Sequence, residues 1–381
     1  MKKVGILVNS IGFGGNERSA VNIAAAVSDR FDVTIIIQED CGNHYGYKGK
    51  VINLNTPCAQ SKVGKILNSF RRINRLNRII KEEKLETIFI ILPVSNPINY
   101  MIFRCKKIVS CRDCGDLIRR TDKYIRMANN SDIIVCNSKY QADYITKQAP
   151  SLAAKTTAIY NIIDINRIHA LKDDDIEESV KLFMSGKKCV ISSGRFANAK
   201  GLCNLLKAFS IVKQRNKNAR LIMIGDGELR GNIEKLIKEL NIENNVLLLG
   251  FKDNPFKYIA KADVFILPSL YEGFPNTLIE AMACGTPVIA ADCPSGPGEI
   301  LDGKAIKKNK ITKYGILLRC FNENNTSWKP DDVTSEHYEM ANAIERLLND
   351  PELSAELAYN ASMRVSDFSS DKISCKWHDI L

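Results

Sequence analysis

The sequence contains no apolar run that approaches the ~20 residues needed by a membrane-spanning helix. Residues 4–8 are apolar, but polar Asn9 and Ser10 follow them at once. That run is too short for the core of a signal peptide and instead indicates a buried strand. We therefore expect a cytoplasmic chain whose cysteines are reduced thiols.

Histidine is scarce, and the cysteines do not have the spacing of a disulfide framework. The four His stand far apart in the sequence, at His44, His169, His337 and His378. The 12 Cys are scattered, and the one C-x-x-C, from Cys111 to Cys114, lacks the second pair of a zinc site. We interpret it as a packing feature, with redox or metal use left open, and we expect no bound metal.

Basic residues clearly outnumber acidic residues in the first half of the sequence, whereas the second half is nearly balanced. Residues 1–170 hold 26 Lys and Arg against 14 Asp and Glu, whereas residues 171–381 hold 28 against 29. The first half therefore carries all of the excess in a formal charge of +11. This asymmetry predicts that one domain faces a nucleic acid or an anionic membrane.

Short apolar runs alternate with amphipathic stretches along the chain. The runs that we interpret as strands are residues 3–9, 33–37, 50–54, 87–92, 107–110, 132–136, 156–160, 188–193, 220–224, 246–249, 264–267, 287–290 and 315–318. Continuous apolar strands that alternate with helices predict parallel sheets covered on both faces. The two series predict an α/β protein with two doubly wound, Rossmann-like domains, residues 1–165 and 166–365.

The hinge between the domains is expected near residues 165–187. This stretch contains the run Asp173-Asp174-Asp175, followed by Glu177-Glu178. One interpretation is a solvated linker helix, and the other is an Asp-x-Asp metal site. The second lacks the preceding apolar strand that would hold two carboxylates on a metal.

A glycine-rich turn, Gly12-Phe13-Gly14-Gly15, follows the first expected strand and leads into a helix. A dinucleotide fingerprint would need glycine where Glu17 stands. A glycine turn at a helix start still offers backbone N–H groups and a positive dipole end to phosphate. We interpret Gly14 and Gly15 as a phosphate-facing loop, with a plain tight turn as the alternative.

Two strand ends in the second half carry similar turns. Gly194 and Arg195 follow one strand, with Lys200 at the start of the next helix, and Gly225 follows the next strand. Ligands bind at the carboxyl ends of strands in doubly wound sheets. Arg195 and Lys200 are therefore expected to reach an anionic group, unless they belong to an exposed basic loop.

The most informative segment is residues 262–290. A strand ends shortly before Glu272, and Pro275 then opens a helix, where its missing N–H loses nothing. The N–H groups near Asn276 and Thr277 are available to phosphate oxygens. Glu280 lies one turn into the helix, so the two carboxylates suit hydroxyl recognition on a sugar and on a ribose.

This segment resembles the signature of glycosyltransferase family 4, the retaining GT-B enzymes that use nucleotide-sugars. The match includes Glu-Gly-Phe-Pro-Asn at 272–276 and Glu-Ala-Met-Ala-Cys-Gly-Thr-Pro-Val-Ile-Ala at 280–290. The family's order is kept by Gly194-Arg195, Lys200-Gly201, Gly225-Asp226-Gly227 and Gly250-Phe251. Residues 14–18 and 160–164 match more loosely.

The resemblance implies a role for each matched residue. Arg195 and Lys200 would bind the diphosphate and offset the charge that grows on the leaving group. Glu272 would contact the donor sugar, Glu280 would bind the ribose, and Phe251 would lie near the base. The other donor-site residues that the resemblance implies are Gly14, Gly15, Gly194, Gly225, Gly273, Phe274, Pro275, Asn276 and Thr277. It further implies no essential metal, and a C-terminal helix, about residues 366–381, that returns to the first domain.

The sequence departs from the family in two places. Many relatives carry a His in the first domain near the reacting sugar, whereas this chain has Cys111-Arg112-Asp113 after the corresponding strand. With the preceding Ser110, this segment resembles a subgroup with Ser-Glu-Arg-Asn in which Cys111 replaces the Glu, so we expect Arg112 or Asp113 to face the acceptor. Residues 294–301 resemble the Pro-Ser-Gly-Pro-Arg-Glu-Ile-Leu of bacterial members, but Gly298 replaces the arginine.

The segment 61–84 concentrates the basic charge, with eight Lys and Arg against two Glu. Its apolar residues recur at helical spacing. One interpretation is a crossover helix with a solvated basic face. The other is a helix that docks on an anionic membrane surface. Nucleic acid is not expected, because no recognised binding module or interleaved aromatics are present.

These observations predict a retaining glycosyltransferase of cell-surface polysaccharide synthesis, such as O-antigen or capsule. We expect it to move a hexose or N-acetylhexosamine from a UDP-sugar to a lipid-linked saccharide, as a peripheral protein on the cytoplasmic face of the inner membrane. No cofactor other than the donor is expected. A GT-B UDP-sugar epimerase and a non-catalytic partner subunit are the alternatives. The intact Glu272 and Glu280 argue against the first, and the intact Arg195, Lys200 and Glu272 argue against the second.

Overall fold

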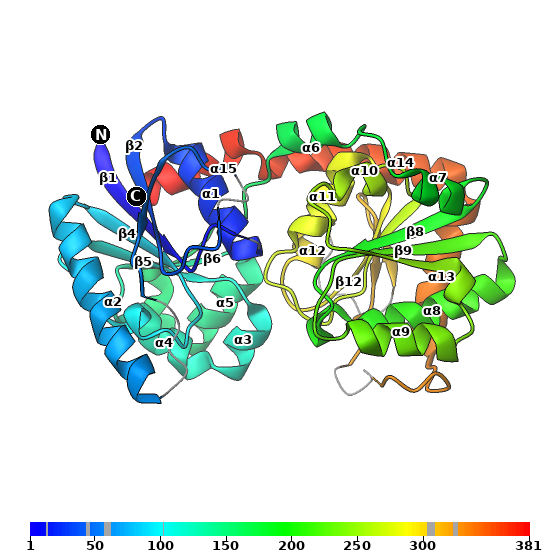
Figure 1. Cartoon of the computed structure of the whole chain (residues 1–381), viewed down its shortest axis with the longest axis horizontal. Coiled ribbons are helices and arrows are strands. Elements are labelled where there is room, and N and C mark those ends of the chain that lie inside the picture. The colour runs from blue at the N-terminus through cyan, green and yellow to red at the C-terminus, as the bar shows by residue number, and fades with distance from the viewer. Residues whose placement is uncertain (13, 43–45, 57–61, 102, 303–308, 323–326) are drawn as a thin grey trace. The chain divides into compact units, whose positions relative to one another are not determined.

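The structure is a computed structural model of the 381-residue chain. It describes residues 1–12, 14–42, 46–56, 62–101, 103–302, 309–322 and 327–381, with the side chains of residues 62, 63, 65 and 66 left out. Three positions named in the sequence analysis lie outside the described residues: Phe13 of the glycine turn, His44, and Ser61 of the basic segment. The chain divides into two compact units (Figure 1): Met1–Ile163 with Phe368–Leu381, and Asp164–Asp367.

The first unit is built on a seven-stranded sheet in which every strand is parallel to its neighbours. Its strand order is β3-β2-β1-β4-β5-β6-β7. The strands are β1 (Lys2–Val8), β2 (Phe31–Ile37), β3 (Lys50–Asn53), β4 (Thr87–Ile91), β5 (Lys106–Cys111), β6 (Ile133–Cys136) and β7 (Thr156–Ala158). The central strands are buried along most of their length because helices cover both faces of the sheet.

Six α-helices accompany the first sheet in the part of the chain that the structure describes: α1 (Gly15–Val27), α2 (Lys62–Glu82), α3 (Cys114–Arg119), α4 (Thr121–Asn129), α5 (Lys139–Gln148) and α15 (Ser370–Ile380). Successive residues of β1 point to opposite faces, so Ile6 packs with α1 and α15 whereas Leu7 packs with α2 and α4. The C-terminal helix α15 belongs to this unit. Its Trp377 is fully buried, with its ring centroid 4.8 Å from that of Phe89, and Thr87 Oγ1 donates a hydrogen bond to Leu381 O at 3.0 Å.

The second unit contains a sheet with the order β10-β9-β8-β11-β12-β14-β13. Its strands are β8 (Lys188–Ser193), β9 (Ala219–Ile224), β10 (Val246–Gly250), β11 (Val264–Leu267), β12 (Val288–Ala291), β13 (Lys310–Ile311) and β14 (Ile316–Leu318). All pairs are parallel except β13 with β14. The short antiparallel strand β13 was not expected, since two residues are too few to show a periodic pattern.

Nine α-helices accompany this sheet among the described residues: α6 (Ile165–Leu171), α7 (Glu178–Met184), α8 (Leu202–Arg215), α9 (Arg230–Glu239), α10 (Phe256–Ile259), α11 (Asn276–Cys284), α12 (Pro297–Ile300), α13 (Ser335–Asn349) and α14 (Pro351–Arg364). The largest core cluster of the unit joins α8, α9 and α13 to one face of the sheet. Helix α8 is buried along most of its length, and its buried residues include the polar Asn204, Lys207 and Ser210.

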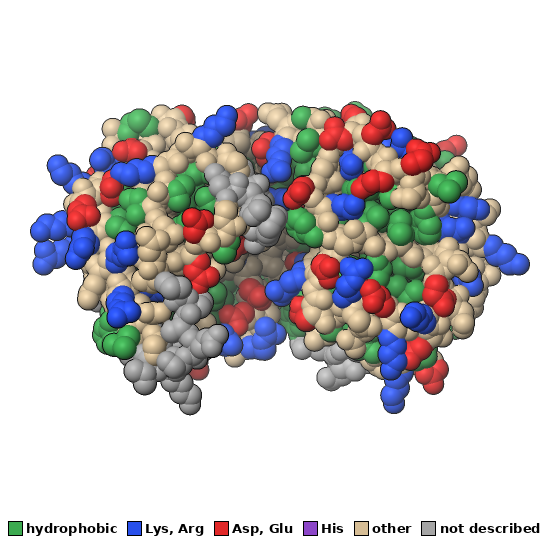
Figure 2. All heavy atoms as spheres, viewed as in Figure 1, with side chains coloured by type: hydrophobic (Ala, Val, Ile, Leu, Met, Phe, Trp, Pro, Cys, Tyr) green, Lys and Arg blue, Asp and Glu red, His purple; other side chains and the backbone are tan. Residues whose placement is uncertain are grey.

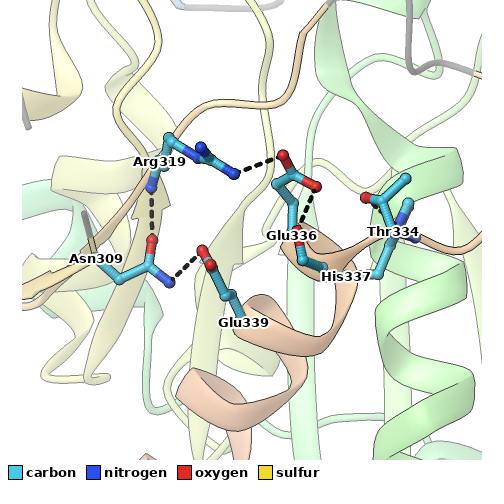
Figure 3. A network of polar contacts seen from close by, with 7 residues as sticks. Asn309, Arg319, Thr334, Glu336, His337 and Glu339 are labelled. Carbon is cyan, nitrogen blue, oxygen red and sulfur yellow. Dashed lines mark hydrogen bonds and ion pairs between the residues drawn. The ribbon is translucent and has the colours of Figure 1, made fainter. Parts of the chain in front are cut away.

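A polar network fixes the start of α13 (Figure 3). Arg319 Nη2 contacts Glu336 Oε1 at 2.6 Å, and Asn309 Nδ2 donates to Glu339 Oε2 at 3.0 Å. Asn309 also accepts the backbone N–H of Arg319 at 2.8 Å, so the residues next to β13 and β14 are tied to the first turn of α13.

His337 continues this network into the core. Its ring is fully buried, where Nδ1 accepts the backbone N–H of Thr334 at 2.9 Å and Nε2 lies 3.2 Å from Asn204 Oδ1. Burial lowers the pKa of His337 to about 4. The ring is therefore neutral at neutral pH, and it caps α13 as a hydrogen-bonding group without charge.

Residues 165–187 are part of the second unit, and this position differs from the linker expected there. Helices α6 and α7 lie within the segment, and Asn254 Nδ2 donates to Leu171 O at 2.8 Å. Lys252 Nζ and the Tyr258 hydroxyl both donate to Glu177, at 2.7 and 2.6 Å, and these bonds lower the pKa of Glu177 to about 2. The acidic run is thus held against Lys and Tyr side chains of the unit, and the chain passes between units at Ile163–Asp164 and Asp367–Phe368.

Among the described residues, no helix combines the length and the apolar character that crossing a bilayer requires.

Candidate functional site

The carboxyl edge of the second sheet contains a topological switch point between β8 and β11. The sheet grows from β8 in two directions, through β9 on one side and through β11 on the other. The connections on the two sides therefore diverge and leave a crevice where ligands bind in folds of this kind. A small hollow lies here, bordered by the ends of β8, β9 and β11 and by the residues that follow them.

Backbone hydrogen bonds join the loops at this edge. Gly194 N donates to Ile224 O at 2.9 Å, and Phe196 N donates to Asp226 O at 2.8 Å. Gly225 has φ +135°, and a Cβ at this position would overlap the carbonyl oxygen of Gly194. Glycine is required because the two backbones are in direct contact.

The loop after β11 joins the same edge. Leu270 N donates to Ala199 O at 2.8 Å. Gly201 adopts φ +59° and lies directly against the carbonyl of Pro268, which leaves no room for a side chain. Lys200 and Glu272, 72 residues apart in the sequence, are brought together by this contact.

Lys200, Glu272 and Ser269 form a compact polar cluster. Lys200 Nζ lies 2.6 Å from Glu272 Oε1, and Ser269 Oγ donates to the same oxygen at 2.6 Å. The Glu272 side chain is only 10% exposed, and that of Lys200 is 24% exposed. Both bonds use Oε1, and no described residue bonds Oε2. The carboxylate is thus fixed in orientation while its second oxygen can accept a hydroxyl from a ligand.

Arg195 lies on the same loop as Lys200, but its side chain is exposed. Its guanidinium forms no ion pair or hydrogen bond with any described residue. The site therefore contains one lysine that is already paired and one arginine whose five N–H donors remain available to an anion.

Helix α11 begins beside this cluster. Pro275 is its N-cap residue and no side chain caps the helix, so the first backbone N–H groups, near Asn276 and Thr277, face outward from the helix end. The Ser295 hydroxyl donates to Gly273 O and fixes the turn before the helix. The start of α11, with Phe274 buried beneath it, is therefore rigid.

Two further expected residues differ in exposure. Glu280 is buried on α11, with 4% exposure, and burial of the Cys284 thiol together with the nearby Glu280 raises the pKa of that thiol to about 12. Phe251 follows β10 at the sheet edge, and 57% of the residue is exposed. Gly250 O accepts the backbone N–H of Gly225 at 2.8 Å, which places Phe251 next to the loop after β9.

The expected residues of the first half form a separate group in the first unit. Arg112 follows β5, and its Nη1 donates to Asn161 Oδ1 at 2.8 Å. Asp113 is the N-cap of α3, where Oδ1 accepts the N–H of Asp116 at 2.8 Å. Arg112 and Asp113 both border a pocket at the carboxyl edge of the sheet.

Gly14 and Gly15 start α1, as the pattern predicts. The carboxylate of Glu17 folds back against Gly14, where a Cβ would collide with it. Burial raises the pKa of Glu17. A phosphate that approaches this helix start would thus meet the Glu17 carboxylate. From the sequence, Glu17 was noted only as the residue that replaces the third glycine of a dinucleotide fingerprint.

Sequence inspection also missed Ser269 and Ser295. Both hydroxyls bond within the site loops, Ser269 to Glu272 and Ser295 to the backbone of Gly273. Serine in a loop carries no pattern of its own, so the signal available was only its position after a buried strand.

Two family models match successive parts of the chain. "Glycosyltransferase Family 4" matches residues 13–167, and "Glycosyl transferases group 1" matches residues 173–318. The chain belongs to the family 4 glycosyltransferases. Its membership confirms the family inferred from the Glu272 segment and identifies the chain as an enzyme, a glycosyltransferase.

Similar proteins include glycosyltransferases of bacteria and archaea. An uncharacterised glycosyltransferase of Methanocaldococcus jannaschii is 33% identical over 65% of this chain and 62% of its own length. The N-acetylgalactosamine-N,N'-diacetylbacillosaminyl-diphospho-undecaprenol 4-alpha-N-acetylgalactosaminyltransferase of Campylobacter jejuni is 27% identical over 98% of this chain and 97% of its own.

Solved structures confirm the fold. HepE of Anabaena in complex with UDP-glucose aligns with a TM-score of 0.78 and 21% identity, over 100% of this chain and 99% of its own. TarM aligns with a TM-score of 0.77 and 17% identity, over 100% and 98%. The family 4 enzyme described here therefore has the expected α/β GT-B fold of two Rossmann-like units.

Proposed function

We propose that this family 4 glycosyltransferase transfers a hexose or N-acetylhexosamine from a UDP-sugar to a lipid-linked saccharide, with retention of anomeric configuration, in cell-surface polysaccharide synthesis. The observation that carries the proposal is the cluster of Lys200, Glu272 and Ser269 beside the unpaired Arg195, at the switch point of the second sheet. A fixed carboxylate and two cations at one crevice suit a sugar joined to a diphosphate.

In this proposal the cations act on the leaving group. Negative charge grows on the nucleotide diphosphate as the bond from the anomeric carbon to its oxygen breaks. Arg195 and Lys200 would stabilise that charge, and the N–H groups at the start of α11 would add the positive end of the helix dipole. Metal-independent catalysis is part of the proposal.

The carboxylates act on hydroxyl groups. Oε1 of Glu272 is held by two donors, so Oε2 would accept a donor-sugar hydroxyl in a defined direction. Glu280 would bind the ribose and Phe251 would stack on the base. The acceptor hydroxyl would attack on the face from which the diphosphate leaves and would pass its proton to the leaving diphosphate oxygen. This same-face attack gives retention.

UDP and a lipid-linked acceptor are supported by the similar proteins. HepE was solved with UDP and with UDP-glucose. Two Campylobacter jejuni relatives, 27% and 24% identical to this chain, act by name on saccharides joined to undecaprenol through diphosphate. We extend both properties to this chain as proposals.

Helix α2 supports a peripheral position on the cytoplasmic face of the membrane. Its buried side includes Leu76 and Ile79, whereas Leu67 is 51% exposed and Phe70 is 63% exposed. Its other exposed side chains include Arg71, Arg75 and Arg78. Figure 2 shows Lys and Arg side chains gathered at the left, over α2 of Figure 1. Exposed apolar groups beside cations suit an anionic lipid surface.

A transfer assay with a panel of UDP- and GDP-sugars and a lipid extract as acceptor source tests the proposal. We expect incorporation from a UDP-sugar, undiminished by EDTA, and an anomeric linkage in the product that matches that of the donor. Glu272→Ala should abolish transfer, while Glu352→Ala, at an exposed position of α14, should not. Transfer by Glu272→Ala at the wild-type rate would refute the assigned site.

A further inference from the structure

The first unit has its own topological switch point, between β1 and β4, with β2 on one side and β5 on the other. A pocket lies at the carboxyl edge beside it. Asn16 borders the pocket from the start of α1, Pro93 borders it after β4, and Arg112 borders it after β5. We call it the Arg112 pocket. Its position is the one at which doubly wound sheets bind ligands.

Arg112 is a half-buried cation that has no carboxylate partner among the described residues. Its one hydrogen bond to a side chain goes to the neutral amide of Asn161, and its Nε is buried with no partner at all. No described Asp or Glu forms an ion pair with it. Burial lowers the pKa of Arg112 only to about 10, so the guanidinium stays charged at neutral pH. A buried charge without a counter-ion is costly in a folded protein, and such groups are found where a ligand supplies the opposite charge.

The acidic residues of the pocket do not supply that charge. Asp116 contacts Arg120 Nη1 at 3.2 Å and accepts a hydrogen bond from the Tyr124 hydroxyl at 3.3 Å. Asp113 is turned to the first backbone N–H groups of α3, where it serves as the N-cap. Both carboxylates are therefore engaged away from the Arg112 guanidinium.

Unsatisfied polar atoms gather at the same sheet edge. Asn137, after β6, donates to Arg112 O at 3.5 Å, but its Oδ1 has no partner. Gln141 is fully buried on α5, and both polar atoms of its side chain lack partners. Buried polar groups are nearly always hydrogen-bonded in native proteins. Because Asn137 contacts Arg112 directly, its unpaired oxygen indicates that this edge is completed by a polar ligand or by bound water.

We propose that Arg112 binds an anionic group of the acceptor, a phosphoryl or a carboxylate oxygen pair, in this pocket. A guanidinium presents two parallel N–H donors that match both groups. Arg119 and Arg120 also border the pocket, but both are exposed, and Arg120 already contacts Asp116. The start of α1 is covered by the Glu17 carboxylate. The anion is therefore assigned to Arg112, the least exposed arginine of the pocket. The assignment to the acceptor rests on the proposed transferase function, whereas the anion site itself does not.

Equilibrium binding by the full chain tests the pocket, with saturating UDP present to fill the nucleotide site. The probes are inorganic pyrophosphate, methyl α-D-glucuronide and the neutral methyl α-D-glucoside. We expect one anion to bind at least tenfold tighter than the neutral glucoside. Pyrophosphate identifies a phosphoryl group, and the glucuronide identifies a sugar carboxylate. Equal binding of all three probes would overturn the proposal.

Matched variants test whether the positive charge that binds the anion belongs to Arg112. Arg112→Gln should lose the preference for the anion, whereas Arg104→Gln, which removes one exposed charge from the loop before β5, should keep it. Arg112→Lys keeps the charge and should retain a preference that is weakened several-fold, which keeps the test valid if the Gln variant fails to fold. An unchanged anion preference in Arg112→Gln would contradict the assignment.

UDP affinity, measured separately on each variant, distinguishes a failure of the proposed transferase function from a failure of the anion site at Arg112. It should equal that of the wild type in Arg112→Gln, because Arg112 belongs to the first unit and the nucleotide site to the second. Absence of UDP binding in the wild type would overturn the proposed function. The anion preference would still show whether the Arg112 pocket binds an anion.

Discussion

At the scale of single residues, the candidate site depends on contacts between groups far apart in the sequence. Lys200 and Glu272 pair because Gly201 lets the loop after β8 approach Pro268 closely. The residue types at 200 and 272 could be predicted from the family signature. Their direct ion pair could not, because a paired and an unpaired lysine look alike in sequence.

Lys200→Met should lower kcat about 10²–10³-fold by removing one charge that stabilises the leaving group. It also leaves Glu272 nearly buried and unpaired, which should cost about 3 kcal/mol of folding free energy. The double variant Lys200→Met/Glu272→Gln should recover stability but not activity. Urea unfolding and steady-state kinetics measure the two effects. Recovered activity in the double variant would show that the charge of Lys200 is dispensable.

Gly225→Ala should weaken UDP binding more than tenfold, because the added Cβ overlaps the carbonyl of Gly194 and the φ of +135° disfavours a side chain. Gly231→Ala is the matched control, since nothing lies within 4 Å of a Cβ at that position of α9. It should leave UDP binding unchanged and stabilise the helix by about 0.5–1 kcal/mol. Equal UDP affinity in both variants would contradict the role given to the loop contact.

At the scale of elements, the strands follow from the sequence closely. Each expected strand is present, with ends that differ by two residues or fewer. Short continuous runs of Val, Ile and Leu between helical stretches are typical of strands that helices bury on both faces. The acidic segment 165–187 was placed less well. The acidic charge of this segment suggested a solvated linker, but in the fold Glu177 accepts hydrogen bonds from Lys252 and Tyr258. These partners are 75 and 81 residues away in the sequence, so no local pattern could predict them.

His337 should make the start of α13 sensitive to acid. Its pKa is about 4 in the folded state and near 6.5 when unfolded, so the unfolded state binds more protons between these values. Stability is therefore complete above pH 6.5 and falls as the pH drops toward 4, by about 2 kcal/mol at pH 5. Chemical unfolding between pH 7 and 5 measures this loss. His337→Gln should flatten the dependence, whereas His169→Gln, at an exposed position, should not.

Helix α2 offers a matched pair of arginines for testing its membrane role. Arg75 is exposed, whereas Arg72 donates from Nε to Thr56 Oγ1 at 3.0 Å and is 16% exposed. Arg75→Gln should weaken binding to anionic vesicles about fivefold, as expected for ~1 kcal/mol per surface cation. Arg72→Gln removes the same charge and should have a smaller effect. Vesicle flotation at low salt measures both, and equal binding to neutral and anionic vesicles would refute the electrostatic contribution.

At the scale of the whole molecule, charge and chemistry are divided between the units. The excess positive charge lies within residues 1–170, whereas the Lys200 and Glu272 cluster lies in the near-neutral remainder. This division could be predicted from sequence. The anion pocket around Arg112 could not, because it depends on which carboxylates turn away from the guanidinium.

Trp377 tests the dependence of the first unit on its last helix. Trp377→Ala should destabilise that unit by about 3–5 kcal/mol, because the ring is fully buried against Phe89. Hydrogen exchange should then accelerate in β1 and β4 while β8 and β11 stay protected. Tyr359→Ala, at an exposed position of α14, should change neither. Equal acceleration in both units would show that they unfold together.

Residues 368–381 are synthesised after the whole of the second unit, although they complete the first. A ribosome adding ~5–20 residues per second needs roughly 10–40 s to translate the ~200 residues between. During that interval the sheet surface around Phe89 lacks the cover of α15, while the second unit can already fold. The nascent first unit thus leaves the apolar surface that later packs against Trp377 uncovered until its last residues are made.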